Sequence, residues 1–248
     1  MSEPSSSPCP SPQPSRTLVG LVLGQSNAAN HGQGQHRARP GVFCLFGGEL
    51  LPARDPLPGA TGEGSSVWIP VANGLLDRGQ YDRVVWIARA VGGSAIRQWA
   101  PGGDLFPRVP AAIVEAHQAG LPITHIFWHQ GEADAHTYNT PPDQYQQAFL
   151  SLRAEIRALG VSAPIYICLA TRFCELSHHS ALREAQRGLV NGQDIRLGPD
   201  TDSLGGADRY DGAHFSAQGI AAFAQQWLDI LAEDFPHPKS LSQNGRGT

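Results

Sequence analysis

The chain has 248 residues and carries 18 Lys and Arg against 22 Asp and Glu, which gives a formal net charge of −4. Its 41% hydrophobic content is enough for a substantial core, and one α/β domain fits this length. The single lysine, Lys239, lies near the carboxyl terminus and the arginines are scattered, so no basic stripe typical of a nucleic-acid surface is present. No run of 18 apolar residues indicates a membrane span.

The two ends of the chain differ in composition from its middle. Residues 1–16 hold five prolines and six serines, and residues 235–248 are polar with Pro and Gly. Such segments bury too little apolar surface to offset their ordering entropy, so we expect a disordered leader and a loose tail around one domain at 17–234. The leader lacks the apolar region of a signal peptide, which makes the cytoplasm the default localisation unless a longer precursor carries an export signal. The four cysteines lack C-x-x-C spacing, and we expect free thiols.

Apolar runs and helical periodicities alternate along the chain. The first run is apolar on both faces, which predicts a buried strand over residues 17–23. Further strands are predicted at 83–88, 125–129 and 164–169, and helices at 107–119, 143–159, 181–190 and 216–232. Strands alternating with helices predict a parallel sheet covered on both faces.

Two stretches are predicted to lack regular structure. Residues 30–73 are rich in Gly, Pro and short polar groups, and long irregular segments in compact domains are usually functional, so we expect this one to frame a wall of a site. Residues 194–204 are predicted to be a variable connection.

Polar clusters follow three of the strands, and a fourth precedes the last helix. They are residues 24–27 (GQSN), 92–94 (GGS), 130–134 (QGEAD) and 211–214 (DGAH). The carboxyl ends of parallel strands meet at one edge of a sheet, where ligands bind, so we expect these clusters to converge. Taken alone, Ser26 would more often cap a helix beginning at Ala28 than perform chemistry.

The pair Asp211 and His214 is the clearest chemical signal. Residues three apart in a turn face each other, so the carboxylate can accept from one imidazole nitrogen and leave the other free to take a proton. A serine hydroxyl is a weak nucleophile and needs such a base. A purely structural alternative, in which the pair caps or salt-bridges the last helix, stays open on the spacing alone.

Acyl transfer also needs hydrogen-bond donors aimed at the developing oxyanion. The backbone amides of residues 92–94, the Ser26 amide and the side-chain amide of Gln130 are suitable types at suitable places. A plain tight turn at the glycines and a turn-stabilising amide at Gln130 are the structural alternatives.

The combination of blocks resembles that of a known family. The segments GQSN at 24–27, GGSAIxxW at 92–99, WHQGExD at 128–134 and DGxHF at 211–215 are similar to those of sialate O-acetylesterase-like carbohydrate esterases. These form carbohydrate esterase family six and its relatives in the SGNH hydrolase superfamily. The resemblance spans residues 17–233 and implies a flavodoxin-like, three-layer α/β/α sandwich with a central parallel sheet, which deacetylates O-acetylated sugars without a metal or another cofactor.

The resemblance also implies a role for each matching residue. Ser26 would be the nucleophile, His214 the general base and Asp211 its orienting acid. The oxyanion donors would be the amides of Ser26 and Gly93 and the side chain of Gln130. We expect the remaining matched residues to brace the site rather than react; they are Asn27, Glu132 and Asp134.

Three other kinds of site are less well supported by the sequence. Ala28 stands where a G-x-S-x-G elbow has its last Gly, which argues against an α/β-hydrolase, and the glycines before Ser94 suit a donor turn better than a second nucleophile. Hydrogen-bonded histidines are more common than a metal site built from His125, His129 and His136.

Sugar stacking by tryptophan and two further functions stay open. Trp68 and Trp99 could stack on a sugar, although core packing is the commoner role of Trp. Besides a carbohydrate acetylesterase, the alternatives are a broader small-acyl esterase or thioesterase and a non-catalytic sugar-binding module. The expected partner is an acetylated saccharide, and the oligomeric state is not readable from the sequence.

Overall fold

A computed structural model describes residues 16–174 and 176–234. The predicted leader and tail therefore lie outside the described residues, except for Arg16. Arg16 does not belong to a disordered leader, because its backbone N–H donates to the Asp82 carboxylate (2.8 Å) and its carbonyl accepts from the Asp82 N–H (2.9 Å).

A seven-stranded sheet forms the middle of the molecule, in the order β3-β2-β4-β1-β5-β6-β7. Its strands are β1 (Thr17–Gly24), β2 (Val42–Phe46), β3 (Glu49–Pro52), β4 (Arg83–Ala88), β5 (His125–His129), β6 (Ile165–Leu169) and β7 (Ile195–Asp200). Every neighbouring pair is parallel except the β2–β3 hairpin. The central strand, β1, pairs with β4 on one side and β5 on the other, which places a topological switch point at its carboxyl end.

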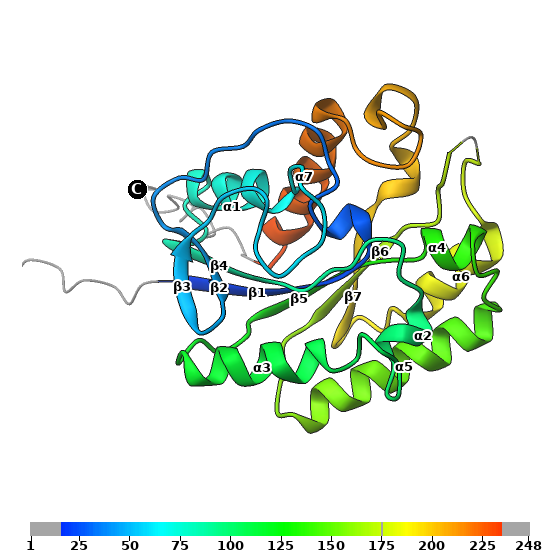
Figure 1. Cartoon of the computed structure of the whole chain (residues 1–248), viewed down its shortest axis with the longest axis horizontal. Helices are drawn as coiled ribbons and strands as arrows, with labels where there is room; N and C mark the ends of the chain where they lie inside the picture. Colours follow the sequence, from blue (N-terminus) through cyan, green and yellow to red (C-terminus); the bar gives the residue numbers. More distant parts are fainter. Residues whose placement is uncertain (1–15, 175, 235–248) are drawn as a thin grey trace, which may run out of the picture.

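Helices cover both faces of the sheet (Figure 1). One face carries α1 (Trp68–Asp77) and α7 (Ala217–Ala232). The other carries α2 (Ile96–Trp99), α3 (Arg108–Gln118), α4 (Glu132–His136), α5 (Pro142–Ala158) and α6 (Ser180–Leu189). Short 3₁₀ helices are η1 (Ser26–Ala28), η2 (Thr201–Ser203) and η3 (Gly206–Asp208). The predicted three-layer α/β/α architecture is confirmed.

Three sequence-based expectations about elements are wrong. No helix begins at Ala28; the chain makes only the single turn of η1. The segment 30–73 is not irregular throughout, because Gly47 and Gly48 adopt positive φ angles (64° and 79°) and close the β2–β3 hairpin, and α1 begins at Trp68.

The third misjudged segment, 194–204, contains an edge strand. β7 pairs with β6 alone and includes Gly198 and Pro199, residues that an edge position tolerates and a central one does not. Its weak apolar pattern is the reason that the sequence did not indicate a strand.

None of the helices in residues 16–174 and 176–234 combines the length and apolar character needed to cross a membrane. In the same residues Cys44, Cys168 and Cys174 are free thiols. Cys9 lies outside the described part of the chain.

An aromatic cluster centred on Phe127 of β5 joins the sheet to the layer of α1 and α7. The Phe127 ring lies 5.0 Å from the Trp227 ring, 5.1 Å from Trp68, 5.6 Å from Trp86 and 6.0 Å from Tyr166. The three contacts with tryptophan are edge-to-face or tilted and the contact with Tyr166 is stacked, and aromatic pairs of these kinds add to the free energy gained by burial.

Replacing Phe127 with Ala therefore leaves a cavity among four aromatic rings that cannot close around it. We expect the unfolding free energy to fall by about 3–5 kcal/mol, measured by urea denaturation followed by Trp fluorescence. Leu150→Ala on the exposed face of α5 is the control, with an expected change of about 0.5 kcal/mol or less. Equal losses in the two variants would contradict this account of the core.

Candidate active site

Ser26 lies at the carboxyl end of the central strand, on a turn that a glycine makes possible. Gly24 has φ of +125°, and a Cβ there would lie 2.0 Å from the carbonyl oxygen of His129. The next residue, Gln25, donates its N–H to that same carbonyl at 2.9 Å. The chain then turns away from β5, and Ser26 opens η1. No side-chain cap bond is made at η1, so helix capping does not explain the serine.

Asp211 and His214 form a hydrogen-bonded pair in the turn before α7. One carboxylate oxygen of Asp211 accepts from the backbone N–H groups of Ala213 (2.9 Å) and His214 (2.6 Å), and the other lies 2.7 Å from His214 Nδ1. Partial burial raises the pKa of Asp211, but these hydrogen bonds outweigh it and hold the pKa below its usual value. With Nδ1 facing a carboxylate, His214 presents Nε2 as the proton-accepting nitrogen.

The alternative that this pair only caps the last helix does not fit the structure. Ser216 is the cap of α7, and its hydroxyl oxygen accepts from the Gly219 N–H at 3.2 Å.

Direct hydrogen bonds join the neighbours of Ser26 to the neighbours of His214. Asn27 donates its side-chain amide to the Ala213 carbonyl at 3.1 Å, and the Gln33 N–H donates to the Phe215 carbonyl at 2.9 Å. The structure thus brings the serine turn and the histidine turn together. No hydrogen bond joins Ser26 Oγ to His214 in the described structure; in ligand-free enzymes such contacts are often long and shorten when substrate binds.

Two of the three expected oxyanion donors are free. Within the described residues, the backbone N–H groups of Ser26 and Gly93 have no hydrogen-bond acceptor. Gly93 is exposed and left-handed (φ +67°), and nothing lies within 4 Å of the position that a Cβ would take. A hydrogen bond fixes the turn at residues 92–94, because Gly92 donates its N–H to the Thr61 hydroxyl oxygen at 2.7 Å.

The third expected donor, Gln130, is not free, and this expectation needs correction. Its side chain is fully buried, and its amide nitrogen donates to the Ser94 carbonyl (2.9 Å) and to the Asp134 carboxylate, with Gln25 Oε1 at 3.3 Å. An amide nitrogen has only two hydrogens, and neighbours within the fold already use both. In this structure Gln130 braces the turn at residues 92–94 instead of facing an oxyanion.

Asp134 is a brace of the same kind. Its buried carboxylate accepts from the Ile96 N–H (2.8 Å), from the Thr140 hydroxyl and from Gln130. Burial raises the pKa of this carboxyl group although these hydrogen bonds oppose the shift. Asp134 therefore connects the turn after β5 to the start of α2.

Glu132 lies beneath the serine turn, as expected of a supporting residue. One carboxylate oxygen accepts from the Asn27 side-chain amide at 3.0 Å, and the other has no partner among the described residues. Burial raises the pKa of Glu132 to about 7, against the opposing effects of Asn27 and Arg209.

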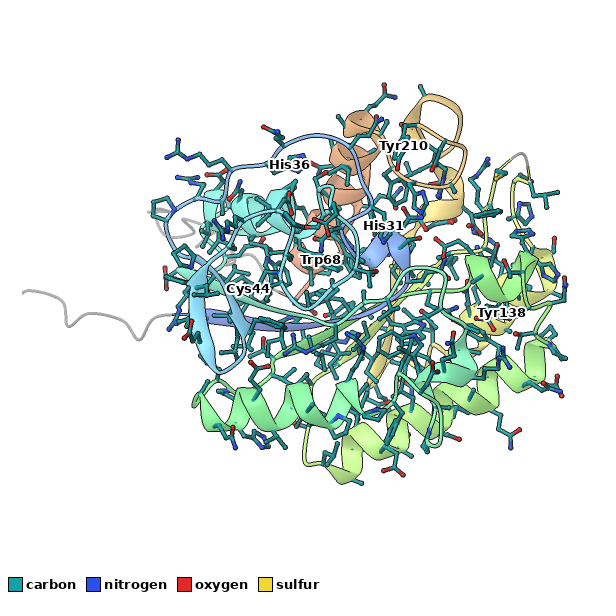
Figure 2. The ribbon with its side chains drawn as sticks, in the orientation of Figure 1. His31, His36, Cys44, Trp68, Tyr138 and Tyr210 are labelled. Carbon is teal, nitrogen blue, oxygen red and sulfur yellow. The ribbon has the colours of Figure 1, made fainter. Side chains whose placement is uncertain are left out.

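Two residues in contact with His214 were missed in the sequence. The ring of His31 is stacked on that of His214, with centroids 5.3 Å apart. The ring of Tyr210 is also stacked on that of His214, with centroids 6.1 Å apart. Both residues are labelled in Figure 2, His31 beside η1 and Tyr210 on the loop before α7. A lone histidine and a lone tyrosine carry no spacing signal, so only the folded structure could reveal them.

The other side chains weighed for function take structural roles. Trp68 and Trp99 are fully buried, so the hypothesis that they stack on a sugar is wrong. Each of the three histidines considered for a metal site has a polar partner in the fold. His125 lies against the Thr124 hydroxyl, His129 against the Thr201 hydroxyl and His136 against the Thr171 carbonyl. Within the described residues, no group of three or more His, Cys, Asp or Glu side chains could hold a metal ion.

A hollow of about 510 Å³ adjoins Asp211. It is lined by Arg172, Cys174, Gly206, Arg209, Asp211 and Gly212. Arg209 donates its hydrogen bonds to three backbone carbonyls. Among the described residues, the Arg172 side chain has one hydrogen bond, from its Nε to the Asp202 carbonyl at 2.9 Å. The hollow is therefore open to a polar ligand beside Asp211.

A doubly covered parallel sheet, with a serine after its central strand and a carboxylate–histidine pair before its last helix, is typical of SGNH hydrolases. Residues 16–233 match the family described as "Carbohydrate esterase, sialic acid-specific acetylesterase", and the chain belongs to this family. It is therefore a carboxylic ester hydrolase, a carbohydrate acetylesterase of the SGNH kind.

Solved structures with the same fold are distant in sequence. One is a protein from Arabidopsis thaliana (TM-score 0.74, 20% identity, covering 90% of this chain and 100% of that one). Another is NanS (TM-score 0.63, 15% identity, covering 90% of this chain and 99% of that one). A third is Est24, a carbohydrate acetylesterase from Sinorhizobium meliloti (TM-score 0.56, 12% identity, covering 89% of this chain and 100% of that one). No curated protein matches the chain.

The buried position of Glu132 predicts a pH-dependent stability. Its pKa of about 7 in the folded protein exceeds the ordinary value of 4.5, so the native state binds an extra proton between these values and stability declines as pH rises through them. Glu132→Gln keeps an acceptor for Asn27 but cannot ionise. From about pH 5 to about pH 8, we expect the wild type to lose roughly 2–3 kcal/mol relative to the variant in urea unfolding. If the unfolding free energies of the two proteins instead changed in parallel with pH, Glu132 would be ionised over this whole pH range.

Proposed function

We propose that this enzyme removes O-acetyl groups from a carbohydrate by a Ser-His-Asp mechanism, through an acetyl-enzyme formed on Ser26. The proposal rests chiefly on the 2.7 Å hydrogen bond between Asp211 and His214, on a turn that is itself hydrogen-bonded to the turn of Ser26. The unbonded N–H groups of Ser26 and Gly93 support it, because both could donate to one oxyanion.

In the first half-reaction, Ser26 Oγ attacks the acetyl carbonyl carbon while His214 Nε2 takes the hydroxyl proton. Asp211 holds the ring in the required tautomer and stabilises the imidazolium that forms. When the tetrahedral intermediate collapses, the C–O bond to the sugar breaks and His214 returns the proton to the departing sugar oxygen. The acetyl group remains on Ser26.

In the second half-reaction, a water molecule attacks the acetyl-serine and gives a proton to His214. Acetic acid leaves as the proton returns from His214 to Ser26 Oγ, which restores the starting state, and the acid then ionises to acetate in solution. The amides of Ser26 and Gly93 stabilise the negative oxygen in both halves, and removal of one such donor typically costs about 3–4 kcal/mol.

The saccharide would occupy the exposed rim around the triad. The hollow beside Asp211 offers arginine and backbone groups to sugar hydroxyls, and Tyr138 and Tyr210 are exposed aromatic rings at this edge of the sheet. Tyr138 also contacts the donor turn, since its hydroxyl donates to the Gly93 carbonyl at 3.4 Å. Exposed rings can stack on the apolar faces of sugars, whereas Trp68 and Trp99 are buried and cannot.

The test is acetate release from acetylated xylan, chitooligosaccharides and sialic acids, with p-nitrophenyl acetate as a general ester. We expect release from at least one saccharide at a kcat/KM above that for p-nitrophenyl acetate, and loss of both activities by about 10⁴-fold or more in Ser26→Ala. Ser151→Ala, at a half-buried serine on α5, is the matched control and should retain full activity.

The outcome separates the competing functions. Turnover of p-nitrophenyl acetate or thioesters without any saccharide would favour the broader esterase or thioesterase. Saccharide binding without any turnover would favour a sugar-binding module. Activity retained in Ser26→Ala would overturn the assignment of the nucleophile.

A further inference from the structure

His31 touches both halves of the catalytic apparatus. Its ring is stacked on that of the base His214 at 5.3 Å with only 21° between the planes. On its other side, His31 Nε2 lies 3.2 Å from the Thr61 hydroxyl, and that hydroxyl accepts the Gly92 N–H at 2.7 Å. One half-buried side chain thus spans the space between the base and the turn that carries the Gly93 amide.

The packing around His31 fixes where its ring can lie. A Cβ on Gly92 would lie 2.9 Å from His31 Nε2, so the ring fits closely against the donor turn. The backbone carbonyl oxygen of His31 accepts from the Tyr210 hydroxyl at 3.3 Å, and the Tyr210 ring is stacked on that of His214. The loop after η1 and the loop before α7 are therefore fastened together at the catalytic base.

The surroundings of His31 also favour its neutral form. The titratable groups that face it are His214, Asp211 and Tyr210. Burial and the neighbouring His214 lower the pKa of His31, and Asp211 only partly opposes them. A neutral ring can lie against His214 without repelling the imidazolium that forms during proton transfer.

We propose that His31 is a positioning residue of the active site, which holds the His214 ring in place by stacking and links it through Thr61 to the Gly92–Gly93 donor turn. The inference rests on the proposed function, since it assigns His31 a role in the same reaction. His214 needs such support because it lies in a loop and its side chain has a single hydrogen bond within the described residues, from Nδ1 to Asp211, about which the ring can still tilt.

Four variants separate the two contacts from a general loss of structure. His31→Ala removes both, His31→Phe keeps a flat ring for stacking, and Thr61→Val cuts only the polar link. His36→Ala is the matched control, because His36 is a half-buried histidine on the same loop that pairs with Asp55 and not with the base (Figure 2).

We expect kcat to fall about 10- to 100-fold in His31→Ala with KM changed less than about twofold, because a displaced base slows chemistry rather than binding. Thr61→Val should lower kcat about three- to tenfold, and His31→Phe, which keeps the stacking but also lacks the link to Thr61, should restore kcat to that same level. His36→Ala should match the wild type. A His31→Ala enzyme as active as His36→Ala would overturn the proposal, and so would failure of Phe to restore activity.

A spectroscopic measurement tests the contact without relying on catalysis. The ring proton signals of His214, recorded by NMR in the Ser26→Ala background, should shift in His31→Ala through loss of the neighbouring ring current and stay close to the parent positions in His36→Ala. Unchanged His214 signals in His31→Ala would refute the stacking role even if the esterase is active. A wild type without esterase activity would instead refute the proposed function while the NMR shift still reported the contact.

Discussion

The site depends on the close approach of β1 to β5 at Gly24. The space beside the His129 carbonyl is too small for any side chain, and a left-handed residue there turns the chain so that Ser26 leaves the sheet edge. The Gln25 side chain then fixes this turn to the next one, because its oxygen lies 3.2 Å from both the Gly131 and the Ala133 N–H groups. The turn of Ser26 and the turn at residues 131–133 are therefore held together by hydrogen bonds, the kind of pre-organisation that acyl transfer requires.

Burial decreases from the bracing side chains to the rim of the candidate site. Glu132 and Asp134 lie at or below 2% exposure and hold neighbouring turns, Ser26 is 7% exposed, His214 is half-buried and Gly93 is exposed. The buried layer is not fully satisfied, since one oxygen of Glu132 and Nδ1 of His129 have no hydrogen-bond partner within the described residues. Such unsatisfied groups reduce stability, and their position beneath Ser26 is consistent with a site built for function rather than for maximal stability.

The sequence predicted the parts of the fold whose burial is repetitive. The strands ending before Ser26, Gly92 and Gln130 are apolar on both faces, and β4 and β5 have their predicted bounds. The edge strands were missed, because β3 is exposed along its whole length, β7 is buried at only half of its positions, and both contain Pro. In the site, the pairing of Asp211 with His214 followed from local spacing, whereas the commitment of Gln130 to Ser94 and Asp134, and the stacking of His31, depend on contacts that spacing does not encode.

Ser26 is proposed to be the one serine activated for attack. A fluorophosphonate reacts with such a serine and stays attached, so intact-mass spectrometry followed by peptide mapping identifies that serine directly. We expect a single adduct on Ser26 that forms with the wild type and does not form with His214→Ala. Modification of Ser94 or another serine, or labelling of Ser26 that persists without His214, would contradict it.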